Sequence, residues 1–271
     1  MQREVDLRDY ERDGYQVIRG VFDPAEVRTF RSAWEEIKSD LDRGVGPMQR
    51  EARFIFGTLP DPLGRIYGDR RLATIASRVL GPDVALYFSR LMVKDAGWNG
   101  DVATHQDAPY FHGTVDKLSI LLPLQDQTEA SGGLQFVAGS HRLGHLGIRG
   151  TILISDFDLP VRAPVLAAGD ICLMNFLTWH FSEPNLSGDD RVLMQLAYQP
   201  ATDGAYFARY LDGPVLVTGT WRTSHFVPYG YGIVPDGGTM PVTASPDSSV
   251  ESDREGKTGL RAIAQTFLRR G

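Results

Sequence analysis

Gly169-Asp170-Ile171-Cys172-Leu173-Met174-Asn175-Phe176-Leu177-Thr178-Trp179-His180 is the stretch around which the chain is organised. A Gly-Asp turn leads into an apolar run, which is typical of a short buried strand, and a histidine follows it. A polar loop comes next, and a second strand opens at Arg191 and runs to Gln199. In that strand alternate residues face opposite sides, so Val192, Met194, Leu196 and Tyr198 should pack outward on a helix. Arg191, Leu193, Gln195, Ala197 and Gln199 should then face the interior.

Further short apolar or alternating runs lie on both sides of this segment, separated by Gly, Pro, Asp and Ser. The strand candidates are 17–22, 84–94, 118–124, 134–137, 151–154 and 171–176. Strands this closely spaced, with no long helices between them, favour an antiparallel barrel or jelly roll over a βαβ sheet. The expected fold is therefore mainly β with flanking α-helices.

Two helices are expected between the first strand candidate, 17–22, and the others. The first begins after Asp23, a suitable N-cap followed by Pro24 and Glu26, and ends at Gly44. The second covers about 69–80, residues 45–64 read as irregular, and together the helices of 23–80 should pack on a β core of about 84–200. Residues 201–271 are expected to hold an aromatic-rich segment, a mobile loop over 237–257 and a terminal helix over 260–270. We expect one domain across 1–271.

Composition excludes several classes of protein. The chain has 271 residues with 28 basic and 34 acidic side chains, a net charge of −6 that disfavours nucleic-acid binding. Cys172 is the single cysteine, so no disulfide can form within the chain. No apolar signal core opens the sequence, and no apolar run approaches the ~18 residues of a membrane span. These features predict a cytoplasmic protein that binds neither nucleic acid nor a membrane; they leave the oligomeric state open.

The residues His105 and Asp107 suggest a metal site. In an extended segment, side chains two apart leave the same face, so a nitrogen and a carboxylate oxygen would converge. His180 is the candidate third ligand, and two histidines with one carboxylate leave coordination positions open. That set is used for ferrous iron in oxygenases, although Zn, Mn or Ni would also accept it.

An inward-facing Arg191 adds a second argument. A buried guanidinium needs an anionic partner, and a bound carboxylate ligand would supply one through two hydrogen bonds. A 2-oxo acid could chelate the metal while its far carboxylate binds Arg191. Ser182 would share the face of His180 if that segment is extended.

The chain resembles the phytanoyl-CoA dioxygenase family of Fe(II)/2-oxoglutarate oxygenases. The resemblance is carried by His105-Gln106-Asp107, by Gly132 to His141, and by His180-x-Ser182-x-Pro184-Asn185 with Arg191 eleven residues after His180. Two positions depart from the family pattern: Ser131 stands where Asn is frequent and Ala138 where Pro is frequent.

This resemblance implies a double-stranded β-helix, a cupin-like jelly roll. It implies that His105, Asp107 and His180 bind Fe(II), and that Arg191 with Ser182 binds 2-oxoglutarate. O2 would be consumed, succinate and CO2 released, and the substrate hydroxylated or oxidatively cyclised. Halogenating relatives lack the carboxylate, so the presence of Asp107 argues against halogenation.

The substrate is expected to be a small natural product. The chain is similar to oxygenases that cyclise glycosides in orthosomycin antibiotics, which makes a glycoside one candidate. Aromatic and histidine residues that could line the pocket mouth are Trp98, Tyr110, Phe111, His112, Trp179, Trp221 and Phe226.

Two alternatives remain at this point. A Zn or Mn cupin-type isomerase would supply more histidines and a glutamate, and would not need Arg191. A non-enzymatic jelly-roll carbohydrate-binding module would not require His105, Asp107 and His180 to converge.

Overall fold

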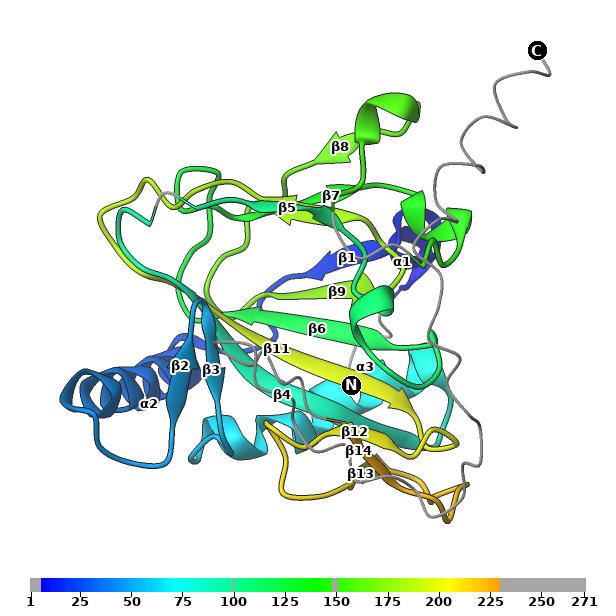
Figure 1. Cartoon of the computed structure of the whole chain (residues 1–271), viewed down its shortest axis with the longest axis horizontal. Coiled ribbons are helices and arrows are strands. Elements are labelled where there is room, and N and C mark those ends of the chain that lie inside the picture. Colours follow the sequence, from blue (N-terminus) through cyan, green and yellow to red (C-terminus); the bar gives the residue numbers. More distant parts are fainter. Residues whose placement is uncertain (1–5, 99, 148–150, 230–271) are drawn as a thin grey trace, which may run out of the picture. The chain divides into compact units, whose positions relative to one another are not determined.

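The computed structural model describes residues 6–98, 100–147 and 151–229, and in them two antiparallel sheets form separate layers (Figure 1). The larger sheet has the order β1 (Tyr15–Ile18), β9 (Ile171–Asn175), β6 (Leu118–Pro123), β11 (Arg191–Pro200), β4 (Val84–Lys94), β3 (Phe54–Phe56) and β2 (Gln49–Glu51), with β13 (Val215–Thr218) also on β4. The smaller sheet has the order β5 (Val102–His105), β10 (His180–Ser182), β7 (Leu134–Val137) and β8 (Val161–Arg162). A separate parallel pair joins β12 (Ala205–Phe207) to β14 (Val227–Tyr229). The predicted mainly-β jelly roll is confirmed.

Within the described part of the chain, three α-helices flank the sheets: α1 (Arg8–Asp13), α2 (Pro24–Arg43) and α3 (Arg70–Leu80). The predicted cap of α2 is present, because the Asp23 carboxylate accepts hydrogen bonds from the backbone N–H of Ala25 (2.7 Å) and Glu26 (2.9 Å). Gly44 ends the helix in the left-handed conformation at φ 65°, where a side chain would be strained. None of the helices in these described residues is both long and apolar enough to cross a bilayer.

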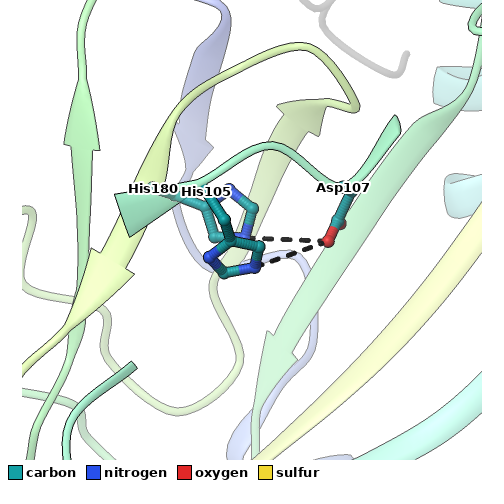
Figure 2. Close-up of side chains that lie close together, drawn as sticks. All are labelled: His105, Asp107 and His180. Atoms are coloured by element: carbon teal, nitrogen blue, oxygen red, sulfur yellow. Dashed lines mark ion pairs between the residues drawn. The ribbon is translucent and has the colours of Figure 1, made fainter. Parts of the chain in front are cut away.

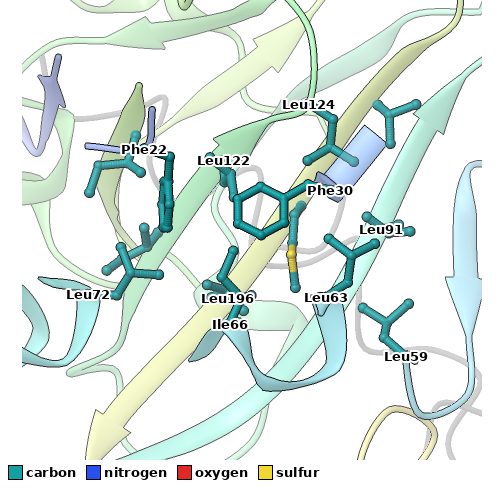
Figure 3. Close-up of a cluster of buried hydrophobic side chains, with 14 of the residues drawn as sticks. Phe22, Phe30, Leu59, Leu63, Ile66, Leu72, Leu91, Leu122, Leu124 and Leu196 are labelled. Carbon is teal, nitrogen blue, oxygen red and sulfur yellow. The ribbon is translucent and has the colours of Figure 1, made fainter. Parts of the chain in front are cut away.

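The alternation along the strands separates two cores. Leu122 and Leu196 point to the outer side of the larger sheet and pack with Phe30 of α2 and Leu72 of α3 (Figure 3). The residues that alternate with these, including Leu121 and Leu193, point to the inner side and pack with Met174. The predicted two faces of β11 are therefore confirmed, and the inner face is the one that can carry a site between the sheets.

Three predictions about local structure were wrong. The strand predicted over 17–22 is β1, which covers Tyr15–Ile18, and residues 19–22 form a turn and bend after it. Residues 151–153 do not form a strand; Ile154–Asp156 is a 3-10 turn, and the apolar Ile152 is buried against Val137 and Trp179 rather than in a ladder. Residues 45–64 are not all irregular, because β2 and β3 form a hairpin whose turn contains Ala52 at φ 49°. The loop of 237–257 and the helix of 260–270 lie outside the described residues, so the one-domain organisation of the whole chain stays a prediction.

Candidate metal centre

The structure brings His105, Asp107 and His180 together from two segments, the end of β5 with the residues that follow it and the start of β10 (Figure 2). His105 ends β5 and His180 begins β10, and these residues are directly opposite each other in the antiparallel ladder. Their Nε2 atoms lie 3.9 Å and 3.8 Å from Oδ1 of Asp107. One nitrogen or oxygen from each residue lies within 4.8 Å of the others, so a single metal ion could bind all three.

Asp107 reaches this point in a way that differs from the prediction. It is not extended with His105: its backbone is helical (φ −71°, ψ −38°) and it precedes the 3-10 turn Ala108–Tyr110. Beyond His105 the N–H of Ala108 donates to Phe176 O (3.1 Å), and Pro109 has no N–H to donate. The convergence follows from this turn and not from strand alternation.

Both imidazole rings are oriented for metal binding. Nδ1 of His105 lies 2.8 Å from Ala103 O, and Nδ1 of His180 lies 3.0 Å from Thr178 O. A carbonyl oxygen only accepts, so Nδ1 carries the hydrogen in each ring and Nε2 keeps its lone pair. Burial, with a smaller contribution from His180, lowers the pKa of His105 to about 4, which keeps that ring neutral at physiological pH.

Gln195, which sequence reasoning did not single out, holds the second oxygen of Asp107. Its Nε2 donates to Asp107 Oδ2 (3.2 Å) and to Ser119 Oγ (2.9 Å), and its Oε1 accepts from Arg90 Nε (2.9 Å). Oδ1 is thereby left for the metal. The sequence did offer a signal for Gln195: it is a polar residue on the predicted inner face of β11, four residues after Arg191.

Arg191 lies in the same cavity and is only 4% exposed. Its Nη2 donates to Gly132 O (3.2 Å), its buried Nε has no partner, and no carboxylate of the described residues pairs with it. Burial, and to a smaller degree Arg53, lowers the pKa of Arg191 to about 10, so the group stays charged at neutral pH. Ser182 is buried and lines the same cavity. The charge and the unsatisfied donor fit a carboxylate ligand.

Three further cations line this cavity, and the sequence analysis missed all of them: Arg53, Arg90 and Lys94. Lys94 is almost fully buried, and its Nζ donates to the backbone oxygens of Ser182 (3.3 Å) and Glu183. Burial, then Arg191 and Arg53, lowers the pKa of Lys94 to about 7. Lys94 is directly opposite Arg191 in the ladder of β4 and β11.

Some of the predicted substrate residues lie near the centre. The ring of Tyr110 is 5.8 Å from the ring of His105, and the ring of Phe111 is 5.6 Å from the Arg90 guanidinium carbon. The Trp98 ring lies 5.1 Å from Nζ of Lys94.

None of the three residues Tyr110, Phe111 and Trp98 lines the cavity itself, and the other predicted substrate residues do not lie at it either. His112 is exposed and stacks on Tyr229, with ring centroids 4.1 Å apart. Trp179 is fully buried in a separate apolar cluster with Val137 and Ile152, which leaves it no surface for a substrate. Trp221 packs against Phe226, with ring centroids 4.7 Å apart. Neither residue of this last pair lines the cavity.

The donor set fits a non-haem iron. Two imidazole nitrogens and one carboxylate, with further coordination positions open, are the ligands of Fe(II) oxygenases. Zn, Mn and Ni accept the same donors, so the metal alone does not identify the chemistry. The adjacent unpaired Arg191 is the feature that the other metal enzymes do not require.

Comparisons with known proteins agree with this geometry. An ectoine dioxygenase from Bordetella parapertussis is 30% identical over 149 residues, which are 50% of this chain and 48% of that protein. An ectoine dioxygenase from Streptomyces coelicolor is 26% identical over 150 residues, which are 51% of this chain and 50% of that protein. The chain thus spans about half the length of the curated relatives it matches.

Solved structures share the fold. The non-haem α-ketoglutarate-dependent epimerase SnoN from nogalamycin biosynthesis has a TM-score of 0.64 at 23% identity, over 73% of this chain and 83% of that one. The iron-bound EctD from S. alaskensis has a TM-score of 0.62 at 25% identity, over 73% and 76%.

The sequence profile of the phytanoyl-CoA dioxygenase family matches residues 10–193, which is more than half of the chain and includes all three metal-ligand candidates and Arg191. The chain therefore belongs to the phytanoyl-CoA dioxygenase family.

Proposed function

We propose that this protein is a non-haem Fe(II)- and 2-oxoglutarate-dependent dioxygenase. The observation that carries the proposal is the presence, in one cavity, of a convergent two-histidine, one-carboxylate cluster and a buried arginine with no anionic partner among the described residues. Family membership supports the same activity.

Each polar group then has a defined role. His105, Asp107 and His180 would hold the iron, and Arg191 with Ser182 would bind the distal carboxylate of 2-oxoglutarate. When bound, the iron would supply the redox chemistry by which O2 oxidises both 2-oxoglutarate, to succinate and CO2, and the substrate.

The protein's own contribution is orientation and exclusion of water. The Nδ1 hydrogen bonds fix both imidazole rings, and Gln195 fixes the Asp107 carboxylate. Apolar side chains of Leu121, Leu134 and Met174 line the cavity beside these groups. In such surroundings a charged hydrogen bond from Arg191 is stronger than it would be in water.

The substrate is proposed to be a small natural product that is hydroxylated or oxidatively cyclised, with glycosides among the candidates. Support comes from fold relatives described as an epimerase and a carbocyclase of nogalamycin biosynthesis. Screening natural products for stimulated succinate release would identify the compound and distinguish hydroxylation from cyclisation.

Anaerobic addition of Fe(II) and 2-oxoglutarate tests the proposal. The proposed chelate should produce a weak visible charge-transfer band, and O2 should then release succinate. Asp107→Ala should lose both signals because the metal loses its carboxylate ligand. Asp101→Ala, an exposed acid four residues before His105, is the matched control and should keep them. An iron-loaded wild-type protein without the band would refute the proposal and favour the isomerase or binding-module alternatives.

A further inference from the structure

We infer that the primary substrate carries an anionic group, a carboxylate or a phosphate or sulfate ester, which binds to Arg53 and Arg90. The inference rests on the proposed function and narrows its substrate class. A neutral substrate would leave these two cations without a counter-charge.

The charge of the cavity is the first argument. Asp107 is the only acidic side chain among the lining residues, against the cations Arg53, Arg90, Lys94 and Arg191. A ferrous ion with Asp107 has one positive charge and Arg191 adds a second, which together balance one 2-oxoglutarate dianion. Lys94 can become neutral because its pKa lies at about 7. Arg53 and Arg90 cannot, since a guanidinium keeps its proton in proteins.

The position of these cations is the second argument. In the ladder of β4 and β11, Lys94 is opposite Arg191, and Arg90 is opposite Gln195. Four residues along a strand correspond to about 13 Å between Cα atoms. The cavity therefore has two cationic ends. The proposed 2-oxoglutarate carboxylate occupies the Arg191 end and leaves the Arg90 end for another ligand.

Arg90 is a preformed anion-binding group. It is 8% exposed, and its guanidinium carbon lies 4.3 Å and 4.6 Å from the ring centroids of Phe54 and Phe88. Its Nε donates to the neutral Gln195, and no carboxylate of the described residues pairs with it. Aromatic rings and an amide hold the guanidinium in place but do not neutralise it, so an anion would gain from binding here.

Arg53 supplies the second cation from the turn between β2 and β3. Its backbone oxygen accepts from Val93 N (2.7 Å), which fixes the turn on β4. Its guanidinium makes no hydrogen bond to any described residue and lies 4.8 Å from the Phe54 ring. Burial and the nearby Arg90 charge lower the pKa of Arg53, as expected for two cations facing one site. One anion bound by both would remove this repulsion.

The proposed anion site at Arg53 and Arg90 lies next to the metal centre, because Gln195 contacts both Arg90 and Asp107. A substrate held by its anionic group would therefore have its neighbouring carbons close to the iron. The rings of Phe54, Phe88 and Phe111 around Arg90 offer apolar surface for that carbon frame.

The test uses three probes of similar shape on the anaerobic Fe(II)- and 2-oxoglutarate-loaded protein: phenylacetate, phenyl phosphate and the neutral phenylacetamide. Binding is measured by calorimetry and by the change in the charge-transfer band. We expect an anionic probe to bind at least tenfold more tightly than the amide. The anion that binds more tightly identifies the group as a carboxylate or a phosphate-like ester.

Variants test which residues cause the preference for anionic probes. Arg53→Gln should reduce the preference for anions at least tenfold, while Arg53→Lys should keep it. Arg50→Gln is the matched control, because Arg50 lies in the same hairpin, is paired with Asp95 and does not line the cavity. Arg53 is chosen over Arg90 because Arg90 is packed among aromatic rings. Arg53→Gln should reduce the affinity for 2-oxoglutarate much less than the affinity for the anionic probes.

Three results would overturn the inference while leaving the proposed function intact. The first is equal affinity for phenylacetate and phenylacetamide, and the second is no binding of either anion at millimolar concentration. The third is an Arg53→Gln variant that loses affinity for 2-oxoglutarate and not for the anionic probes. Loss of the wild-type charge-transfer band would instead refute the proposed function.

Discussion

Arg191 and Gln195 are polar residues on the inner face of β11, where the neighbouring inward residue Leu193 is apolar. Burying either group is costly unless its hydrogen bonds are made. Gln195 makes three with Asp107, Ser119 and Arg90, whereas Arg191 keeps an unsatisfied Nε. The hydrogen bonds of Gln195 are thus satisfied within the protein, whereas Arg191 requires a ligand.

Removing the Arg191 guanidinium should weaken 2-oxoglutarate binding. The loss of a hydrogen bond to a charged group is about 1.5–3 kcal/mol, or roughly ten- to a hundredfold in affinity. Anaerobic titration of Arg191→Ala with 2-oxoglutarate measures the effect, and Ser182→Ala should show a smaller loss. Wild-type affinity in Arg191→Ala would mean that the distal carboxylate binds elsewhere.

Gln195→Leu should weaken metal binding without unfolding the protein. Residues that hydrogen-bond to metal ligands typically change metal affinity about 10–100-fold when replaced. Competition between the protein and a chelator for Fe(II) measures this without turnover. Ser119→Ala removes only the other acceptor of Gln195 and serves as the control. If Gln195→Leu bound Fe(II) like the wild type, Gln195 would have no role in positioning Asp107.

The elements that carry the site are held by turns as well as by ladders. The Asp170 side chain, 4% exposed before β9, accepts from the backbone N–H of Gly20 (2.9 Å) and Ala167 (2.9 Å) and from Arg19 (2.6 Å). Gly169 beside it is needed because a Cβ there would lie 2.4 Å from Phe22 O, at φ 93°. The Gly-Asp turn therefore joins the start of β9 to the end of β1.

Asp170→Ala should destabilise this junction. Its partners Arg19, Gly20 and Ala167 are exposed residues that would lose their acceptor, and losing a typical hydrogen bond costs about 0.5–1.5 kcal/mol. Urea denaturation should show this decrease in the free energy of unfolding, while the exposed Asp158→Ala should differ little from wild type. An unchanged midpoint would show that water replaces the carboxylate at this turn.

At the scale of the whole molecule, a buried ion pair connects segments far apart in the chain. Nζ of Lys117, just before β6, lies 2.8 Å from Oδ2 of Asp203, just after β11. The Asp203 carboxylate also accepts from Thr114 N (2.7 Å) and Ala205 N (2.9 Å). Gly113 is required beside it, since a Cβ there would lie 2.2 Å from the same carboxylate at φ 88°.

Asp203→Asn should lower the free energy of unfolding by about 3–5 kcal/mol, because it leaves the buried Lys117 charge unpaired. The double variant Asp203→Asn/Lys117→Met removes that charge and should recover part of the loss. Thermal or urea unfolding compares the two. A double variant no more stable than the single one would show that the Lys117 charge is not the source of the cost.

The same pair predicts a pH dependence. Burial alone would raise the pKa of Asp203, but the hydrogen bond and charge of Lys117, with the backbone hydrogen bonds from Ala205 and Thr114, together lower that pKa below its ordinary value. The stabilisation is therefore present above the ordinary aspartate pKa and is lost as the pH falls through the lowered one. Acid unfolding of the wild type should accordingly include a component that Asp203→Asn lacks.

Local patterns in the sequence were sufficient for much of the fold. The cap at Asp23, the stop at Gly44 and the alternation along β11 each depend on residues a few positions apart, so they could be predicted directly. The same holds for the candidates His105, Asp107, His180 and Arg191, whose residue types and spacing carry the family resemblance.

Only the tertiary structure decided how these residues meet. The pairing of His105 with His180 and the hydrogen bond from Gln195 to Asp107 join residues from different segments, and the helical backbone of Asp107 interrupts the expected strand. Arg53 lies 52 positions before His105 in a hairpin with too few residues to show a strand pattern. Which strands pair and which like charges share one cavity depend on contacts across the whole chain, and local periodicity does not encode them.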